Sequence, residues 1–344
     1  TLVKETTTVT KDVSGSLLIS AADGATLKGI QIGGDLILAP GVTKDVTLVD
    51  CVIQGNIRNY GTGEVRFEAP QITPESTATK PSEVYKPGAT LDRTLEYGGK
   101  TVPIYRDRPL NVFSDVDFIW TGEENETQRR LEYLGGEFRT RYGIDVSSFQ
   151  GEIDWDAVAD DNIDFAMVRV GFRGTGTGSL NTDKYYEQNI RGAMRAGLET
   201  GVYFFAQAVT VEEAIEEADY VISLLDGLDI NGPVAYDWEM HDSTYRVYGT
   251  SPEMATACAV AFCERIKDAG YTPMVYGGTY VTYMKYDQGA LADYLSWYPE
   301  YKSEKSEKLC PTLVYHMDYW QFSSTRAVAG ISGRVDMNIQ FIRR

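Results

Sequence analysis

From about residue 142 onward, short apolar runs alternate with longer segments of helical period. Five of the runs are nearly continuous, which is typical of parallel strands buried on both faces; they cover 142–149, 165–172, 201–207, 233–239 and 272–278. The segments between them carry apolar residues at helical spacing; they cover 153–161, 183–197, 211–227 and 251–270. The last of these begins with Ser251-Pro252, a helix-start signal, and ends at Gly270. This alternation predicts βα units that form a parallel sheet with right-handed crossovers.

The C-terminal end departs from this pattern. After a further segment around 280–294, three runs at 295–301, 314–323 and 333–340 are joined by connections too short and polar for full helices. We therefore predict five βα units followed by three strands. A length of about 205 residues suits a closed barrel. An open flavodoxin-like sheet is the alternative, but it would lack the usual Gly-rich phosphate loop after its first strand.

The first 68 residues show no helical period. Short β-branched or Leu-rich segments recur roughly every ten residues with Gly and Asp between them, which predicts a small all-β module. Two interpretations stay open, a stacked structure like part of a parallel β-helix and a plain β-sandwich. Nothing in this stretch suggests a ligand site, so we interpret it as an accessory module.

Residues 69–139 are predicted to connect the two parts. The stretch 69–90 is rich in Pro, Ser and Thr, which is typical of an extended linker. Beyond it, 97–105 suggests a hairpin and 127–136 a short helix ended by its glycines. The predicted domains are thus 1–68, a linker and irregular connection over 69–139, and a barrel over 140–344.

Four carboxylates fall at predicted strand ends, where barrel enzymes keep their chemistry. Asp145 closes the first strand, Asp237 and Glu239 close the fourth, and Asp336 closes the last. Because successive strand residues face opposite ways, Asp237 and Glu239 point to the same side, with Cα atoms about 6.5–7 Å apart. Like charges so close raise the proton affinity of one member. A carboxylic acid beside a carboxylate is what glycosidic bond cleavage needs.

Aromatic residues accompany these acids, and aromatic faces suit sugar rings. They lie on the third and fifth strands and on the last three: Tyr203, Tyr276, Trp297, Tyr298 and Trp320. Any one of them alone is as readily explained by the core of a barrel.

Charge and composition exclude several other classes. With 32 basic and 50 acidic residues, the net charge is −18, which disfavours nucleic acid and anionic membranes. The chain has no run of 18 apolar residues, so we expect no membrane insertion. Its two histidines, His241 and His316, are too few for a typical zinc cluster, and no G-x-S-x-G motif accompanies them. The four scattered cysteines suggest buried thiols and no disulfide scaffold.

Residues 142–344 resemble family 25 of the glycoside hydrolases, the N-acetylmuramidase lysozymes. The resemblance rests on seven motifs in the family's order: YGIDVSSFQGEIDW, RVGFRG, DKYYEQNIRGAMRAGLETGVYFF, PVAYDWE, MVYGG, WQFSS and GRVDMN. It implies a modified TIM-like (β/α)5(β)3 barrel that hydrolyses the β-1,4 bond between N-acetylmuramic acid and N-acetylglucosamine in bacterial peptidoglycan. It implies no metal or cofactor, and we expect a monomer that is extracellular or on the bacterial cell surface.

The resemblance also implies roles for individual residues. Glu239 would be the general acid, Asp237 would assist the substrate's N-acetyl group, and Asp145 and Asp336 would hold the charge balance and the sugar. The residues expected to contact substrate are Tyr203, Tyr276, Trp297, Trp320 and Arg169, the last from RVGFRG.

The resemblance leaves some questions open. Phe204 stands where the family often has His, so we expect a local packing change there. Neighbouring-group participation, which retains configuration, is favoured over direct inversion because the family's substrate carries an N-acetyl group. A chitin-type hydrolase and a non-catalytic wall-binding protein are the competing functions, since a fold alone does not decide function.

Overall fold

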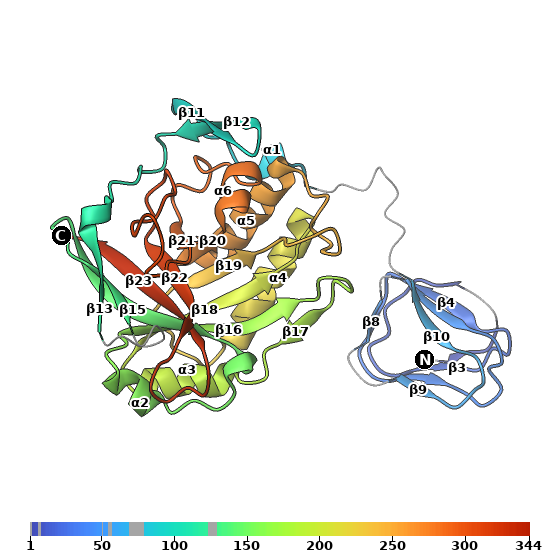
Figure 1. Ribbon diagram of the computed structural model, residues 1–344. Coiled ribbons are helices and arrows are strands. Elements are labelled where there is room, and N and C mark those ends of the chain that lie inside the picture. Colours follow the sequence, from blue (N-terminus) through green and yellow to red (C-terminus); the bar gives the residue numbers. More distant parts are fainter. Residues whose placement is uncertain (1, 6–7, 50, 54–56, 69–78, 123–128) are drawn as a thin grey trace. The chain divides into compact units, whose positions relative to one another are not determined.

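The structure, a computed structural model, describes residues 2–5, 8–49, 51–53, 57–68, 79–122 and 129–344 (Figure 1). The chain divides into two compact units, Thr1–Thr77 and Ala78–Arg344. Each unit has its own cluster of buried apolar side chains. We describe the two separately.

The first unit is built from short strands that pair in parallel. Two ladders run in the orders β1-β3-β6-β9 and β10-β7-β4-β2, and β5 pairs with β8. The strands are β1 (Leu2–Val3), β2 (Thr8–Val9), β3 (Leu17–Ile19), β4 (Ala25–Lys28), β5 (Gln31–Ile32), β6 (Leu36–Leu38), β7 (Val46–Val49), β8 (Val52–Ile53), β9 (Ile57–Asn59) and β10 (Val65–Glu68).

Each ladder of this unit stacks segments that follow one another along the chain. Leu17 pairs with Leu36, and Leu36 pairs in turn with Ile57. Alternate residues face inward, so Leu17, Leu36 and Leu38 have no exposed surface. Stacked parallel rungs correspond to the β-helix-like interpretation, whereas a β-sandwich pairs its strands antiparallel.

The second unit contains a closed barrel of eight strands. Their order is β15-β23-β22-β21-β20-β19-β18-β16, and β15 pairs with β16 to close the ring. Neighbours are parallel except around β23, which runs antiparallel to β15 and β22. The barrel strands, with β17 added at the edge of β16, are β15 (Phe138–Val146), β16 (Phe165–Arg173), β17 (Leu180–Thr182), β18 (Glu199–Ala206), β19 (Val234–Trp238), β20 (Pro273–Tyr276), β21 (Leu295–Pro299), β22 (Tyr319–Arg326) and β23 (Val335–Arg343).

Helices follow each of the first five barrel strands along the chain. They are α2 (Trp155–Asp160), α3 (Tyr186–Arg195), α4 (Val211–Leu224), α5 (Pro252–Asp268) and α6 (Thr279–Met284), and a 3-10 turn, η2 (Ser148–Gln150), precedes α2. The predicted start of α5 is confirmed, because the Ser251 side chain accepts a hydrogen bond from the Met254 N–H and Pro252 opens the helix. Gly270, with φ of +91°, follows its end. No helix among the described residues is long and apolar enough to cross a membrane.

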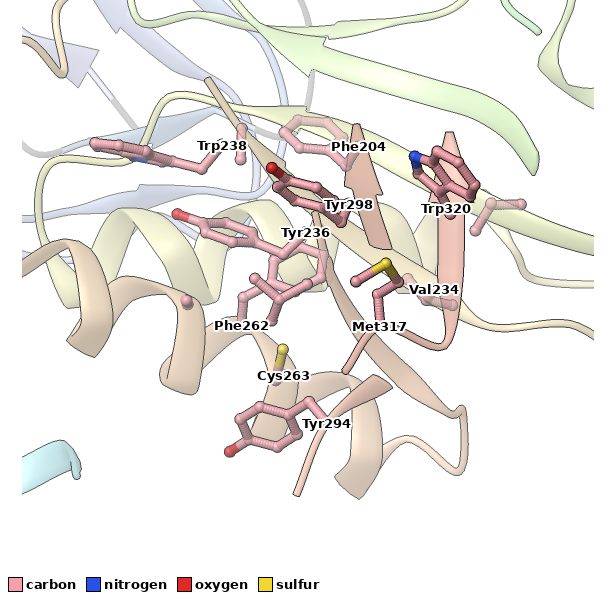
Figure 2. Packing of buried hydrophobic residues seen from close by; sticks show 14 of the residues in the cluster. Phe204, Val234, Tyr236, Trp238, Phe262, Cys263, Tyr294, Tyr298, Met317 and Trp320 are labelled. Carbon is pink, nitrogen blue, oxygen red and sulfur yellow. The ribbon is translucent and has the colours of Figure 1, made fainter. Parts of the chain in front are cut away.

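The barrel strands bury side chains on both faces. Inside the barrel, Phe165 and Met167 of β16 pack with residues of β19 to β22. Gly143 leaves room for this packing, since a Cβ there would come within 2.3 Å of the Phe165 ring. Outside, the Tyr236 ring packs against Phe262 of α5, with ring centroids 4.8 Å apart (Figure 2). This two-sided burial explains the continuous apolar runs in the sequence.

The segment before the barrel is more ordered than its composition predicts. Residues 79–139 belong to the second unit and contain α1 (Pro81–Val84), a hairpin of β11 (Leu91–Tyr97) and β12 (Lys100–Tyr105), η1 (Asp115–Asp117), and a hairpin of β13 (Phe118–Thr121) and β14 (Arg130–Tyr133). A hairpin is therefore present where 97–105 predicted one, but it spans 91–105, since its first strand precedes the predicted range. The short helix predicted over 127–136 is wrong, because 130–133 is a strand that buries Leu131; residues 127 and 128 lie outside the described ones.

The four cysteines are unpaired, and Cys258, Cys263 and Cys310 are buried. Burial raises the pKa of the Cys310 thiol to about 11 and that of Cys263 well above its usual range. These buried thiols are therefore protonated at neutral pH and pack as small apolar groups.

Candidate active site

A cavity of about 390 Å³ opens where the parallel barrel strands end. It is lined by Asp145, Ser147, Phe149, Gln150, Arg169, Tyr203, Phe205, Asp237, Glu239, His241, Tyr276, Trp297, Tyr301, Gln321 and Asp336. The structure thus brings together eight of the nine residues that were expected to act in catalysis or contact substrate; the aromatic Tyr298 also lies outside this lining. The ninth, Trp320, lies elsewhere.

Asp237 and Glu239 face this cavity side by side. Trp238 between them points outward, and its indole N–H donates to the Ala208 carbonyl oxygen at 3.1 Å. Burial raises the pKa of Asp237 well above its usual range, and the charge of Glu239 raises it further. Burial also raises the pKa of Glu239, against the effect of His241, whose Nε2 lies 3.1 Å from Glu239 Oε2. Burial thus favours the protonated form of both carboxyl groups, and the charge of Glu239 adds to this effect at Asp237.

Asp145 and Asp336 form the second carboxyl pair. They stand opposite each other where β15 pairs with β23. Burial raises the pKa of Asp145 to about 6. Burial and the charge of Asp145 raise the pKa of Asp336 to about 8. At pH 7 this pair therefore holds one carboxylate, mainly on Asp145, and one carboxylic acid.

Two buried amides hold Asp145 in place. Gln321 Nε2 and Asn338 Nδ2 both donate to Asp145 Oδ2, at 2.9 and 2.8 Å. The amides are oriented in turn, because the Tyr276 hydroxyl donates to Gln321 Oε1 and the Trp297 indole donates to Asn338 Oδ1. Two of the predicted sugar-contacting aromatics are thus also fixed by the network around the acid.

The sequence prediction missed both amides, although a signal for them was present. Asn338 stands two residues after Asp336, so strand alternation turns both side chains the same way. Gln321 follows Trp320 directly, so only one of the two can face the barrel interior.

Arg169 supplies a positive charge close to the acids. Its guanidinium lies 2.8 Å from Asp183 Oδ2 and donates to Ser148 Oγ at 3.2 Å. Asp183 is buried and also accepts from the backbone N–H groups of Ser148 and Tyr185. The charge of Arg169 lowers the pKa of Asp237, against the effect of burial. Asp183 was not foreseen, because it comes from the loop before α3 and meets Arg169 only in the folded chain.

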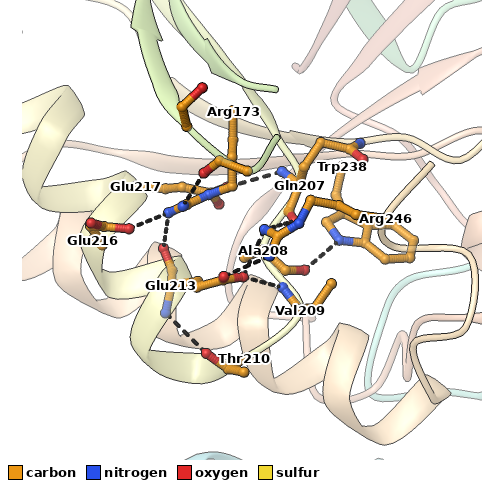
Figure 3. Close-up of polar contacts among 12 residues, drawn as sticks. Arg173, Gln207, Ala208, Val209, Thr210, Glu213, Glu216, Glu217, Trp238 and Arg246 are labelled. Carbon is orange, nitrogen blue, oxygen red and sulfur yellow. Dashed lines mark hydrogen bonds and ion pairs between the residues drawn. The ribbon is translucent and has the colours of Figure 1, made fainter. Parts of the chain in front are cut away.

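A polar network behind the cavity supports the segment that carries Glu239 (Figure 3). Gln207 Nε2 donates to the Glu239 carbonyl oxygen at 2.8 Å, and the Gln207 N–H donates to Glu217 Oε1 at 3.0 Å. Glu217 is fully buried and also accepts from Arg173 Nε at 2.8 Å. Burial raises the pKa of Glu217 to about 7. Through these contacts α4 is joined to the end of β19.

The loop after β19 is held by a second ion pair of the same network. Arg246 makes a two-point contact with Glu213 of α4, at 2.7 and 2.9 Å, and donates to the Gln207 carbonyl oxygen at 2.9 Å. Glu213 also accepts from the Val209 N–H at 2.8 Å. A bidentate arginine contact of this kind fixes direction as well as distance. Residues 239–246 are therefore tied to α4 at both ends.

The prediction for Trp320 is wrong. Its indole N–H donates to the Glu300 carbonyl oxygen at 3.0 Å, and its ring packs against Phe118 and Phe322 in the outer core. The side chain has no exposed surface. The next residue, Gln321, takes the inward position. The outer face of β22 is covered by the hairpin β13–β14, which composition alone had assigned to a connecting region.

This arrangement can present an acid and a base to one bound molecule. The cavity holds two carboxyl pairs with raised pKa values beside the aromatic rings of Tyr203, Tyr276 and Trp297. A comparison with protein-family models decides the family: the model of the glycosyl hydrolases family 25 matches residues 144–331, more than half of the chain. The chain belongs to glycosyl hydrolase family 25.

Two curated relatives match this chain over only part of their own length. The chain is 26% identical over 197 residues to the autolytic lysozyme of Clostridium acetobutylicum, covering 57% of this chain and 54% of that protein. It is 28% identical over 201 residues to lysozyme M1 of Streptomyces globisporus, covering 57% and 66%. The matched part thus spans about half to two thirds of these relatives.

Solved structures agree on the fold. The spore cortex lytic enzyme SleM of Clostridium perfringens superposes with a TM-score of 0.50 at 23% identity, over 58% of this chain and 67% of that one. The modular autolysin LytC of Streptococcus pneumoniae gives a TM-score of 0.50 at 24% identity, over 72% and 57%.

Phe204, where the family often has His, does not face the cavity. It is fully buried, and its ring packs against Tyr220 of α4 with centroids 6.2 Å apart. Phe204 therefore packs on the outside of the barrel, and the cavity is lined by its neighbours Tyr203 and Phe205.

Proposed function

We propose that this chain is a peptidoglycan hydrolase of the lysozyme type, which cleaves the β-1,4 bond between N-acetylmuramic acid and N-acetylglucosamine. Family membership supports the reaction class, and the lysozymes among its relatives support the substrate. The observation that carries the proposal is the pair Asp237 and Glu239, which face one cavity and whose pKa values are both raised by burial. A catalytic acid needs such a raised proton affinity at neutral pH.

Glu239 acts as the general acid in this proposal. It gives its proton to the glycosidic oxygen as the bond to the anomeric carbon breaks, which leaves a hydroxyl on the departing sugar. Asp237 accepts a hydrogen bond from the N–H of the substrate's N-acetyl group, so that the carbonyl oxygen of that group bonds to the anomeric carbon. Water then opens this ring intermediate, with Glu239 taking the proton of the water. The outcome is retention of configuration.

The other polar groups hold charge and substrate. The carboxylate of Asp145, the acid of Asp336 and the guanidinium of Arg169 set the charge around the bound sugar. Tyr203, Tyr276 and Trp297 line the same cavity and offer faces on which a pyranose ring stacks.

The proposal extends to architecture and setting. We count the barrel as the (β/α)5(β)3 form, with five helix-bearing strands followed by β21 to β23. A wall-cleaving enzyme acts outside the cell membrane, so we place the protein in the medium or on the cell surface.

The test compares the wild type, Glu239→Gln and a control, Glu187→Gln, on purified peptidoglycan. Glu187 is exposed on α3, where it pairs with Arg191 four residues on, and it does not line the cavity, so its amide leaves the site unchanged. Products are reduced with borohydride and identified by mass spectrometry. We expect wild type and control to release fragments ending in reduced N-acetylmuramic acid, and Glu239→Gln to be slower by about 100-fold or more.

Other outcomes identify the competing functions. Cleavage of chitin oligomers without release from several wall types would make the protein a hydrolase of another N-acetylglucosamine polymer. Binding to walls without any cleavage would make it a wall-binding protein. Fragments ending in reduced N-acetylglucosamine would support a peptidoglycan hydrolase, but one that cuts a different bond from the one proposed.

A further inference from the structure

A cavity of about 420 Å³ lies beside α5 and α6, apart from the candidate active site. It is lined by residues from the stretch 85–105, by the start of α5, and by the end of α6 with the residues that follow it. Among the described residues, none lines both this cavity and the active-site cavity. The stretch 85–105 precedes residue 144, where the family match begins. The matched barrel alone therefore does not form this cavity.

The wall that carries Tyr85 is fixed to the loop after α6. The Gly88 N–H donates to Asp287 Oδ2 at 2.9 Å, and the Gly289 N–H donates to Oδ1 of the same carboxylate at 3.0 Å. The two glycine backbones approach closely, since a Cβ on Gly289 would lie 2.4 Å from the Gly88 Cα. Asp287 is joined in turn to α5, because its N–H donates to Thr256 Oγ1 at 2.9 Å.

The hairpin of β11 and β12 forms another wall, and it is fixed as well. The Tyr105 N–H donates to the Tyr315 hydroxyl oxygen at 3.1 Å. The Tyr97 ring packs against the Tyr283 ring of α6 with centroids 5.1 Å apart, and the Tyr283 hydroxyl oxygen accepts from the Val314 N–H at 2.9 Å. The cavity is therefore preformed, which spares a ligand the entropy cost of ordering its walls.

The lining presents several apolar rings to solvent. Pro87, Pro103 and Pro252 are exposed, and Tyr85 and Tyr105 are half-buried, so that part of each ring is open to a ligand. The volume lies in the range of about 300–1,000 Å³ that is typical of small-molecule sites. Rings of this kind suit a pyranose, whose C–H face packs on them while its hydroxyl groups point to the polar rim.

The charges of the lining disfavour a polyanion. Among the described residues that line the cavity, Lys100 is the one cation, against Glu253 and Asp287. Lys100 and Glu253 are exposed and free to bind hydroxyl or amide groups, whereas Asp287 is occupied by backbone N–H groups. A neutral saccharide with N-acetyl groups matches this lining better than a phosphate-bearing polymer does.

We propose that this cavity is a second binding site for the glycan strands of the wall, separate from the site of cleavage. The identity of the polymer rests on the function proposed above. Both sites lie on one compact unit, so a strand held in the cavity keeps the active site close to the wall. The cavity therefore contributes to the binding of long or immobilised strands and not to the cleavage of short soluble ones.

The experiment measures binding by the full chain that carries Glu239→Gln, so that strands are not cleaved. The probe is glycan strands of peptidoglycan, stripped of their peptides by an amidase and immobilised on a biosensor. Tyr85→Ala removes a ring from the lining, and Lys100→Ala together with Glu253→Ala removes its two exposed charges. Tyr271→Ala is the matched control, because Tyr271 is also half-buried against the same core but lines neither cavity.

We expect Kd to rise about threefold to tenfold in Tyr85→Ala and in the double variant, and to stay at the parent value in the control. With Glu239 restored, all of these variants should cleave a soluble peptidoglycan tetrasaccharide with wild-type kcat and KM, since so short a substrate occupies only the site of cleavage.

The outcomes separate this inference from the proposed function. Parent-like binding by either cavity variant overturns the second site, and so does an equal loss in the control. The double variant keeps the test decisive, because both of its side chains are exposed and their removal leaves the core intact. A loss seen only on strands that keep their peptides would assign the cavity to the peptide and overturn the glycan as its ligand. A wild type that cleaves no peptidoglycan overturns the proposed function, whereas binding to stripped strands judges the cavity independently.

Discussion

Replacing Asn338 with Leu tests how the amides set the protonation of Asp145. Asn338 makes two contacts, one to Asp145 Oδ2 at 2.8 Å and one from the Trp297 indole at 2.8 Å. Leu has a similar volume and makes neither. The variant therefore loses a donor to the carboxylate and leaves the indole N–H, which is buried, without an acceptor.

The two losses depend differently on pH. The orphaned indole costs about 1–3 kcal/mol at any pH. A hydrogen bond to a charged group is worth about 1.5–3 kcal/mol, so its loss raises the pKa of Asp145 by about 1–2 units. In the wild type burial raises this pKa from 3.8 to about 6. The group therefore contributes stability that is fully present below about pH 4 and is lost as pH rises through 6.

In the variant, the stability contributed by protonated Asp145 is lost over a pH range that extends higher than in the wild type. At pH 5 Asp145 is protonated in both folded proteins, so only the indole term separates them. At pH 8.5 the variant loses about 1–3 kcal/mol more, at about 1.4 kcal/mol for each unit of pKa. Urea unfolding of both proteins at pH 5, 7 and 8.5 measures the difference in the free energy of unfolding.

Trp297→Phe provides the control background, because it removes the indole N–H that Asn338 accepts. In that background, Asn338→Leu should leave the free energy of unfolding unchanged at pH 5. Its destabilising effect should still increase between pH 5 and 8.5. A destabilisation that stays the same at all three pH values would refute the claim that Asn338 holds down the pKa of Asp145.

Three further changes probe other parts of the site. His241→Gln should move the alkaline limb of the kcat/KM profile to higher pH, since His241 lowers the pKa of Glu239; an unmoved limb would count against Glu239 as the acid. Arg173→Met should lower the free energy of urea unfolding by about 3–5 kcal/mol at pH 8.5 and by less at pH 5, because Arg173 lowers the pKa of Glu217 and so stabilises the charged form of this buried carboxyl group, which is populated at the higher pH; a cost that is greater at pH 5 would contradict this. Trp320→Phe should lower the free energy of unfolding by about 1–3 kcal/mol and leave KM unchanged; a raised KM would return that residue to the substrate site.

The acids were predictable because two simple rules locate them. Continuous apolar runs locate the parallel strands, and a carboxylate at the end of such a run lies at the mouth of a barrel. The prediction that Asp336 closes its strand is wrong, because Asp336 stands at the start of β23, which runs antiparallel to β15 and β22 and so begins at the same mouth. Strand alternation then places Asp237 and Glu239 on the same side, as the cavity lining confirms. These rules need no information about distant parts of the chain.

The aromatic side chains were harder to assign, because both faces of a barrel strand are buried. An apolar run does not reveal which residues turn inward, and a shift of one residue exchanges the faces. Trp297 was assigned to the interior correctly and Trp320 was not. Gln321, the polar residue in an apolar strand, was the better marker of the inner face.

Contacts between distant segments could not be predicted at all. Asp183 meets Arg169, and Glu217 meets Arg173, only when loops and helices pack on the barrel. The strand at 130–133 was mistaken for a helix, since four residues carry too little periodicity to distinguish the two.

The hairpins that precede the barrel determine at which residue this catalytic unit can be fused to another domain. Phe118 and Leu131 from β13 and β14, and Val102 and Ile104 from β12, are buried in the same core as the barrel. A chimaera that joins a foreign wall-targeting module at residue 140, just before the family match begins at residue 144, would expose the surface under these side chains and invite aggregation. A junction near residue 79 keeps that surface covered, so the portable piece of this protein is about 60 residues longer than its family motifs suggest.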